Sequence, residues 1–129
     1  MIAGIIVTGM CCSGASVELI REDGTTCTLP PLPQGRNFHT QVGLEVCGGV
    51  NGYGDGSEYL NSCVTFSAGT WTSSHTLAVS RAYHVSWASY PGGALLLGGW
   101  DRAAQRSTEL LSSTSSTTTP QFSLAYETR

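Results

Sequence analysis

Gly93–Leu111 reads GALLLGGWDRAAQRSTELL, and Ala3–Ile20 reads AGIIVTGMCCSGASVELI. Both segments contain, in the same order, an apolar run, a turn with glycine, a polar loop and the pattern Ser-x-Glu-Leu. They lie about 90 residues apart, and a divergent copy lies midway, with Leu44–Gly49 reading LEVCGG and Ser62–Phe66 reading SCVTF. A fixed period of 40 to 50 residues is typical of repeat architectures. The spacing therefore predicts three tandem copies of one unit.

A second landmark gives the same period. Arg36-Asn-Phe-His39 and Arg81-Ala-Tyr-His84 share the pattern Arg-x-aromatic-His and lie 45 residues apart, and Arg129 follows 48 residues further on. We therefore treat residues 1–129 as one partial domain with approximate units 1–35, 36–80 and 81–128, in which Arg129 opens the next unit.

Each unit is expected to contain four short β-strands. Period-2 alternation and short apolar runs place them in the central copy at Phe38–Gln41, Leu44–Cys47, Cys63–Phe66 and Trp71–Ser74. No persuasive 3.6-residue apolar period is present, and Ala103–Leu111, the strongest helical rival, matches a strand of the first copy. The predicted class is all-β, with essentially no helix.

These features together resemble the kelch repeat. The resemblance rests on glycine doublets that end an apolar strand, a tryptophan about two dozen residues later, and an Arg-x-x-His that opens each unit. The residues that carry it are Arg36, His39, Gly48, Gly49, Trp71, Arg81, His84, Gly98 and Gly99. The first copy departs from the pattern, with Thr8-Gly9 in place of a doublet. The resemblance implies kelch-type β-propeller blades of four antiparallel strands around a central axis, with ligands held by loops at one end.

Such a propeller is expected to be incomplete in this chain. Propellers use about 4 to 8 blades, whereas 129 residues supply fewer than three. We expect an open arrangement, a fragment of a longer protein, with self-association through open blade faces as the alternative, since uncovered apolar faces promote association.

The repeated residues have structural roles in this interpretation. Adjacent glycines allow sharp turns and close approach between blades. His39 and His84 occupy the same place in two units, so we expect them to form hydrogen bonds inside or between blades rather than to bind metal. His75 has no counterpart in the other units and is expected in a loop or at a strand edge.

The predicted function is a non-enzymatic interaction module that binds a protein through blade-end loops. The loops Val50–Asn61 and Trp100–Arg106 join the second and third strands of adjacent blades and should emerge at the same end. Exposed aromatic and arginine side chains often anchor interfaces. The candidate partner contacts are Tyr53, Tyr59, Trp100, Asp101 and Arg102.

Two alternatives remain open. Some enzymes, such as galactose oxidase, also use kelch-like propellers and gather copper ligands, including Tyr and His, from several blades and a further domain. No residue of this chain is assigned to that set, so the enzyme alternative rests on fold analogy alone. The other alternative is a substrate-adaptor propeller of a larger protein, which delivers bound proteins to a degradation machine.

Composition argues against several other functions. Only 12% of residues are charged, the six Lys and Arg are scattered, and the net charge is −3, so neither nucleic acid nor an anionic membrane is an expected partner. No apolar stretch approaches the roughly 20 residues that span a bilayer. No Cys, His and carboxylate set has zinc-like linear spacing, and no Gly-x-Ser-x-Gly is present. No catalytic, cofactor or metal residue is therefore predicted.

The chain has five cysteines, of which Cys47 and Cys63 form the most attractive pair. Cys47 ends the second predicted strand of its unit and Cys63 begins the third, so a hairpin would place them side by side. A bridge closing a loop of about 15 residues would stabilise the fold by roughly 3 kcal/mol. Two buried thiols are the other interpretation, and both stay open. Low charge, abundant Ser and Thr and this bridge favour an extracellular over a cytoplasmic location.

Overall fold

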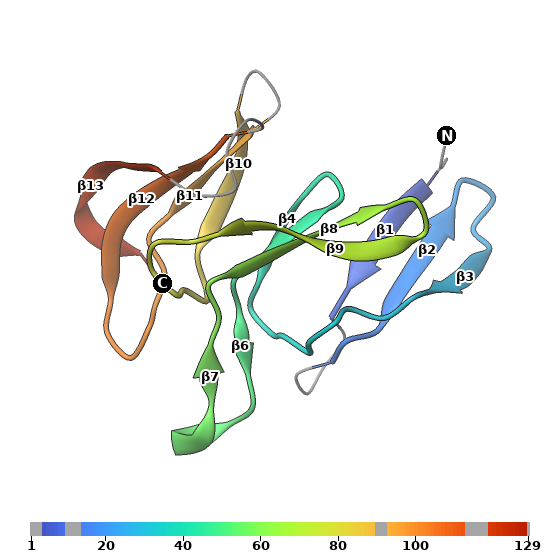
Figure 1. The fold of residues 1–129 in the computed structure, drawn as a ribbon, viewed down its shortest axis with the longest axis horizontal. Coiled ribbons are helices and arrows are strands. Elements are labelled where there is room, and N and C mark those ends of the chain that lie inside the picture. The colour runs from blue at the N-terminus through green and yellow to red at the C-terminus, as the bar shows by residue number, and fades with distance from the viewer. Residues whose placement is uncertain (1–3, 10–13, 90–92, 113–118, 129) are drawn as a thin grey trace.

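The computed structural model describes residues 4–9, 14–89, 93–112 and 119–128, and its architecture is all-β. Three antiparallel sheets follow one another along the chain, and Figure 1 shows them side by side with the N-terminal and C-terminal sheets on opposite sides of the central one. The first sheet consists of β1 (Gly4–Thr8), β2 (Val17–Arg21) and β3 (Thr26–Leu29), in that order.

The second and third sheets have four strands each. The second has the order β4 (Thr40–Val42), β5 (Glu45–Cys47), β8 (Ser62–Ser67) and β9 (Thr70–Thr76). The third has the order β10 (Val85–Ser89), β11 (Gly93–Leu97), β12 (Gln105–Leu111) and β13 (Thr119–Thr128). Consecutive strands are therefore neighbours in every sheet, except where a small hairpin intervenes between β5 and β8.

That small hairpin projects from the second sheet (Figure 1). It is formed by β6 (Val50–Asn51) and β7 (Glu58–Tyr59), which pair with each other and enclose the short 3-10 helix η1 (Gly54–Gly56). The expectation of essentially no helix is met, because η1 is the one helical element in the described parts of the chain. None of the described residues form a helix of the length and hydropathy that crossing a membrane requires.

The predicted strands of the central unit match the second sheet, with one correction. Prediction placed the first strand at Phe38–Gln41, but β4 covers Thr40–Val42. Phe38 has a φ of +55°, in the left-handed region, and such a residue cannot continue an extended strand. Ala103–Leu111 ends in β12, so its interpretation as loop followed by strand is correct. Arg129, predicted to open a further unit, lies outside the described residues.

Two apolar cores lie on opposite faces of the second sheet, as strand alternation requires. Val46 and Val64 face one way, and Cys47 and Cys63 face the other. The first core joins the first and second sheets and contains Val17, Leu32, Val46, Val64, Phe66 and Trp71. The second core joins the second and third sheets and contains Cys47, Cys63, Leu77, Ala94, Leu96 and Leu111. Each sheet thus buries apolar surface against its neighbour.

Candidate functional site

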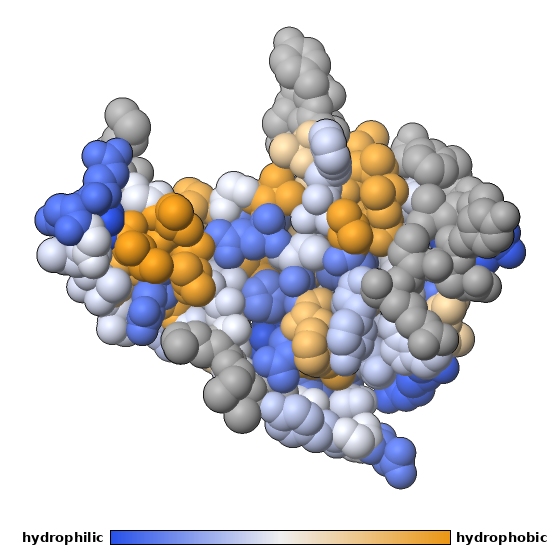
Figure 2. Space-filling model, turned by 180° about the vertical axis from the view of Figure 1, so that it is seen from behind, coloured by the Kyte–Doolittle hydropathy of each residue, from blue (hydrophilic) through white to orange (hydrophobic). Residues whose placement is uncertain are grey.

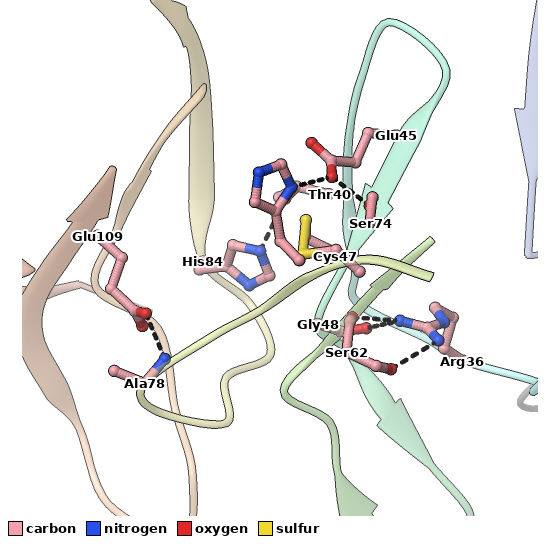
Figure 3. Close-up of a disulfide and its surroundings, with 12 residues drawn as sticks. Arg36, Thr40, Glu45, Cys47, Gly48, Ser62, Ser74, Ala78, His84 and Glu109 are labelled. Carbon is pink, nitrogen blue, oxygen red and sulfur yellow. Dashed lines mark hydrogen bonds and ion pairs between the residues drawn. A yellow bond between two sulfur atoms is a disulfide. The ribbon is translucent and has the colours of Figure 1, made fainter. Parts of the chain in front are cut away.

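Two buried arginines bind equivalent groups in the second and third sheets. Arg36 Nη1 donates to the carbonyl oxygens of Gly48 and Ser62 at 2.9 and 3.0 Å, and its Nη2 donates to Ser62 Oγ at 3.1 Å. Figure 3 shows this guanidinium beside Gly48 and Ser62. Arg81 makes the same three contacts with Gly98 and Ser107 at 2.7, 3.0 and 2.9 Å. Each arginine therefore ties the start of its unit to the second and third strands of the same unit.

The charge of these two arginines is balanced differently. Burial lowers the pKa of Arg36 to about 10, which still leaves it charged at neutral pH. Arg81 additionally pairs with Glu109, with 2.7 Å between Nη2 and Oε2, and both side chains are almost fully buried. Glu109 lies two residues after Ser107. The equivalent residue of the second sheet, two residues after Ser62, is Val64. The carboxylate of Glu109 also accepts hydrogen bonds from the backbone N–H groups of Ala78 and Val79.

The glycine doublets lie at close backbone contacts, and the Gly48–Gly49 doublet lies where the second unit meets the third. A Cβ added to Gly48 would lie 2.5 Å from the carbonyl oxygen of Arg81, and one added to Gly99 would lie 2.7 Å from the carbonyl oxygen of Ala82. All four doublet glycines have positive φ values between 64° and 104°. Gly49 N–H also donates to the Arg81 carbonyl at 2.8 Å. Close backbone approach thus excludes side chains at Gly48, Gly49 and Gly99.

The two histidines of the repeated pattern reach across to the preceding sheet. His39 Nε2 lies 2.8 Å from Thr8 Oγ1, and His84 Nε2 lies 2.7 Å from Thr40 Oγ1. Burial, followed by the nearby Arg81 and then His39, lowers the pKa of His84 to about 3. Burial and the nearby Arg36 also lower the pKa of His39. Both rings are therefore neutral near pH 7, which suits hydrogen bonding between sheets.

Trp71 connects the second sheet to the segment that follows the first. Its ring is buried against Phe66, with 5.2 Å between ring centroids, and its Nε1 donates to the carbonyl oxygen of Pro30 at 2.9 Å. The predicted repeat residues therefore lie at contacts between neighbouring sheets or within their cores.

The two loops predicted to emerge together are in direct contact. Arg102 Nη2 donates to the carbonyl oxygen of Ser57 at 2.9 Å. Its guanidinium carbon lies 5.4 Å from the ring centroid of Tyr59, a cation–π geometry. The loop after β5 and the loop after β11 thus form one continuous surface, which we call the loop-end surface and define by Ser57, Tyr59 and Arg102 with the residues around them.

A pair of stacked aromatic rings borders this surface, and sequence analysis did not select it. Phe38 and Tyr83 lie with ring centroids 4.1 Å apart and planes 20° apart, and both side chains are largely exposed. Both have a positive φ, 55° and 57°, which is uncommon for bulky residues. The aromatic position of the Arg-x-aromatic-His pattern was the signal that could have identified them.

The rings line a pocket of about 250 Å³ at the loop-end surface. Phe38 and Tyr83 form part of its wall, and Tyr53 and Tyr59 from the β6–β7 hairpin form another part. Such a concave site with aromatic walls and backbone polar groups is suited to binding an apolar or aromatic side chain of a partner. No strongly acidic or basic group dominates its lining.

The five predicted contact residues differ in exposure. Tyr53 and Arg102 are exposed, whereas Tyr59, Trp100 and Asp101 are half-buried. The backbone of Trp100 pairs with that of Ala82 in both directions, so this residue also fixes the loop to the start of its unit. Asp101 lies 3.6 Å from the guanidinium of Arg102. All five therefore belong to the loop region, but only Tyr53 and Arg102 present most of their side chains to solvent.

Cys47 and Cys63 are joined by a disulfide, with 4.1 Å between their Cα atoms. They face each other across β5 and β8, as the hairpin argument expected (Figure 3). Among the described cysteines, Cys27 is free, and Cys11 and Cys12 lie outside the described residues. The bridge fits an oxidising compartment, which the sequence analysis also favoured.

The disulfide lies in a polar cluster that sequence analysis missed. The carboxylate of Glu45 accepts hydrogen bonds from Ser74 Oγ and His75 Nδ1, and the ligand atoms of Glu45, Cys47 and Cys63 all lie within 4.8 Å of one another. His75 stands on β9, an edge strand, in agreement with its expected place. Linear spacing gave no signal because cross-strand pairing, rather than a short motif, brings these groups together.

The outer face of the first sheet carries exposed apolar side chains. Ile5, Val7 and Ile20 remain at least one-third exposed. Figure 2 shows a hydrophobic patch over this sheet, at the left of the view. The patch is on the part of the molecule that the second sheet does not cover.

Comparison with known proteins gives a match of fold only. No protein-family model matches the chain, and no curated protein matches it. Among solved structures, the chain is similar to one titled "Structure of YjhT", with a TM-score of 0.77 and 13% sequence identity. The match covers 98% of this chain and 51% of that one, so the chain spans about half the length of this structural neighbour.

Proposed function

We propose that this chain is part of a kelch-type β-propeller whose successive sheets are blades, and that it acts as a non-enzymatic protein-binding module. The repeated arginine contacts, the glycine doublet at the junction of the second and third units, and the histidine bonds between sheets support the blade interpretation.

The single observation that supports binding is the joining of two loops by Arg102. Its contacts with Ser57 and Tyr59 connect loops from neighbouring sheets into one surface beside the Phe38–Tyr83 stack. Rigid strands hold these loops at fixed positions, an arrangement in which loops present contact residues. Exposed Tyr, Trp and Arg side chains are the groups most often found as interface anchors.

One double variant and one matched control variant test this proposal. Tyr53→Ala/Arg102→Ala removes the two exposed contacts, while Ser67→Ala/Thr70→Ala alters exposed residues at the opposite end of the second sheet. We expect the first variant to weaken binding to an affinity-captured partner by at least about tenfold, and the control to leave the dissociation constant unchanged. Equal melting temperatures of both variants would show that folding is intact.

The variant carrying alanine at all five predicted positions serves as the second step. If neither it nor the double variant changes the affinity for a partner that binds the unaltered protein, the loop-end surface is not the binding site. Equal weakening by Ser67→Ala/Thr70→Ala would also contradict the assignment.

The uncovered apolar face of the first sheet fits the proposed open propeller. In a closed ring the remaining blades would cover Ile5, Val7 and Ile20, whereas in the isolated chain these residues promote self-association. The extracellular location stays part of this proposal and rests on the disulfide and the low charge.

A further inference from the structure

Four residues of types that bind metals converge on one face of the second sheet. Glu45 and Cys47 lie two residues apart on β5 and therefore point to the same side. Cys63 on β8 pairs with Cys47, and His75 on β9 pairs with Cys63. His75 Nδ1 contacts Glu45 Oε2, and the carboxylate lies within 4.8 Å of both sulfur atoms. Figure 3 shows Glu45 and Cys47 on this face.

The repeat supplies an internal comparison for these residues. Gly9, Gly48 and Gly98 donate from N–H to the carbonyl oxygens of Ser16, Ser62 and Ser107 respectively, so the three sheets can be aligned on this bond. The places of Glu45, Cys47 and Cys63 are then taken by Ile6, Thr8 and Val17 in the first sheet, and by Leu95, Leu97 and Thr108 in the third.

His75 likewise has an apolar counterpart. Its pairing with Cys63 corresponds to the pairing of Leu29 with Val17 in the first sheet. None of the aligned positions in the other two sheets is a Cys, Glu or His. The packing of the repeated unit therefore does not require these four residues. The reason for their presence together must lie in the chemistry of their side chains.

The surroundings of His75 are those of a metal-binding imidazole. Its Nε2 lies 2.8 Å from the carbonyl oxygen of Ser112, so Nε2 carries a proton and donates it to that acceptor. A backbone carbonyl in this position fixes the tautomer of a ligating histidine and leaves the other nitrogen available as a ligand. The other nitrogen, Nδ1, donates its proton to Glu45 in the oxidised chain and becomes a ligand when a metal ion displaces that proton.

We propose that reduction of the Cys47–Cys63 disulfide converts this cluster into a zinc-binding site with Cys47, Cys63, Glu45 and His75 as ligands. The S–S bond takes up two electrons and two protons from a dithiol reductant, which is itself oxidised to a disulfide, and the chain gains two thiols. Zinc binding then displaces both thiol protons and the Nδ1 proton of His75 to solvent. Two thiolates, an imidazole and a carboxylate form a ligand set that favours Zn²⁺ over Ca²⁺ or Mg²⁺. This inference does not rest on the proposed function.

The burial of the cluster is compatible with entry of an ion. Both cysteines are buried, whereas the side chains of Glu45 and His75 are 17% and 12% exposed. An ion can therefore approach along the Glu45–His75 edge of the sheet. The two sulfur atoms lie in the core between the second and third sheets. A bound ion would therefore stabilise the second sheet at this junction.

The test uses the chain with Cys11, Cys12 and Cys27 replaced by serine, so that Cys47 and Cys63 are the only thiols. A water-soluble phosphine serves as the reductant: it takes the oxygen of water to become a phosphine oxide, and it supplies no competing thiol. We expect one equivalent of Zn²⁺ per reduced chain after desalting, and essentially none for the oxidised chain. Cobalt substitution should give the absorption bands of tetrahedral Co²⁺ with thiolate ligands.

Two conservative variants separate ligation from folding. Glu45→Gln and His75→Gln should each weaken zinc binding by at least about 100-fold, beyond the range for groups that only orient ligands. Glu58→Gln, at an exposed carboxylate on β7, is the matched control and should leave the affinity unchanged. Zinc should also raise the melting temperature of the reduced chain, because a ligand that binds only the folded state stabilises it.

Three results of the zinc-binding measurements would each overturn the proposal. They are absence of zinc from the reduced chain, equal zinc content in the oxidised chain, and unchanged affinity in both Glu45→Gln and His75→Gln. Circular dichroism before and after reduction, with zinc present throughout, shows that the measured chain is folded. A reduced chain that unfolds even with saturating zinc would equally contradict a zinc-stabilised site.

Discussion

Arg81 and Glu109 form a buried ion pair, with 2.7 Å between Nη2 and Oε2, at a place where the second sheet has Val64. Removing one partner of such a pair leaves an uncompensated buried charge and costs roughly 3–5 kcal/mol. We expect Glu109→Ala to lower the free energy of unfolding by about this amount, as measured by urea denaturation. Glu58→Ala, at an exposed carboxylate, should change it by less than about 0.5 kcal/mol.

Glu109→Val tests whether the second and third units are equivalent, because it places a valine where the second sheet has Val64. Arg36 is buried, and the hydrogen bonds that it donates to Gly48 and Ser62 go to neutral oxygen atoms. If the two units are equivalent, Glu109→Val should cost less than Glu109→Ala. A larger loss for valine than for alanine would show that the third unit does not accept the residue of the second at this position, where the carboxylate also accepts two backbone N–H groups.

Gly48 should be far less tolerant of alanine than Gly43. Both have positive φ, 67° and 59°, so both substitutions incur the cost of a left-handed conformation, roughly 1–2 kcal/mol. A Cβ at Gly43 meets no atom within 4 Å, whereas one at Gly48 would lie 2.5 Å from the Arg81 carbonyl. Thermal and urea unfolding of Gly48→Ala and Gly43→Ala should therefore differ by several kcal/mol, and similar losses would contradict close packing of successive units.

His84 should make the protein less stable in acid. Its pKa is lowered from the ordinary 6.5 to about 3, chiefly by burial, so the folded chain keeps it neutral while the unfolded chain binds a proton. Stability contributed by the neutral ring is complete above pH 6.5 and is lost as pH falls from there toward 3. The neighbouring Arg81 and His39 act in the same direction.

The corresponding measurement compares the pH dependence of unfolding in wild type and His84→Gln. Between pH 6 and 4 the wild-type curve should be steeper by up to about 1.4 kcal/mol per pH unit, the value for one proton. Parallel curves for the two proteins would show that His84 takes up its proton over the same pH range in the folded and unfolded chains, contrary to its buried position.

The sequence predicted the sheets well because their strands are short, alternating and bounded by glycine turns. Leu44–Cys47, Cys63–Phe66 and Trp71–Ser74 fall on β5, β8 and β9 with small differences at their ends. The first strand was placed too early because Phe38, an aromatic residue with high strand propensity, adopts a left-handed conformation to stack on Tyr83. Tertiary contact outweighs local propensity at this position.

The candidate site was predictable only in part. The meeting of the loops after β5 and β11 followed from the repeat, since equivalent loops emerge at the same end, and Arg102 does contact Tyr59. The Phe38–Tyr83 stack and the cluster around Glu45 were missed. Their members are 45 residues apart in one case and spread over three strands in the other, so only strand register and packing between units bring them together.

The central claim is that each small sheet depends on the next one for its cover, and amide hydrogen exchange of the bonds between sheets tests it most directly. Gly49 N–H donates to the Arg81 carbonyl and Tyr83 N–H donates to the Phe38 carbonyl, so both link successive units. We expect these two amides to exchange as slowly, within about tenfold, as a strand amide such as that of Leu96, because they open only when the units separate or unfold. Exchange at the unprotected rate at Gly49 and Tyr83, with Leu96 still protected, would contradict the account.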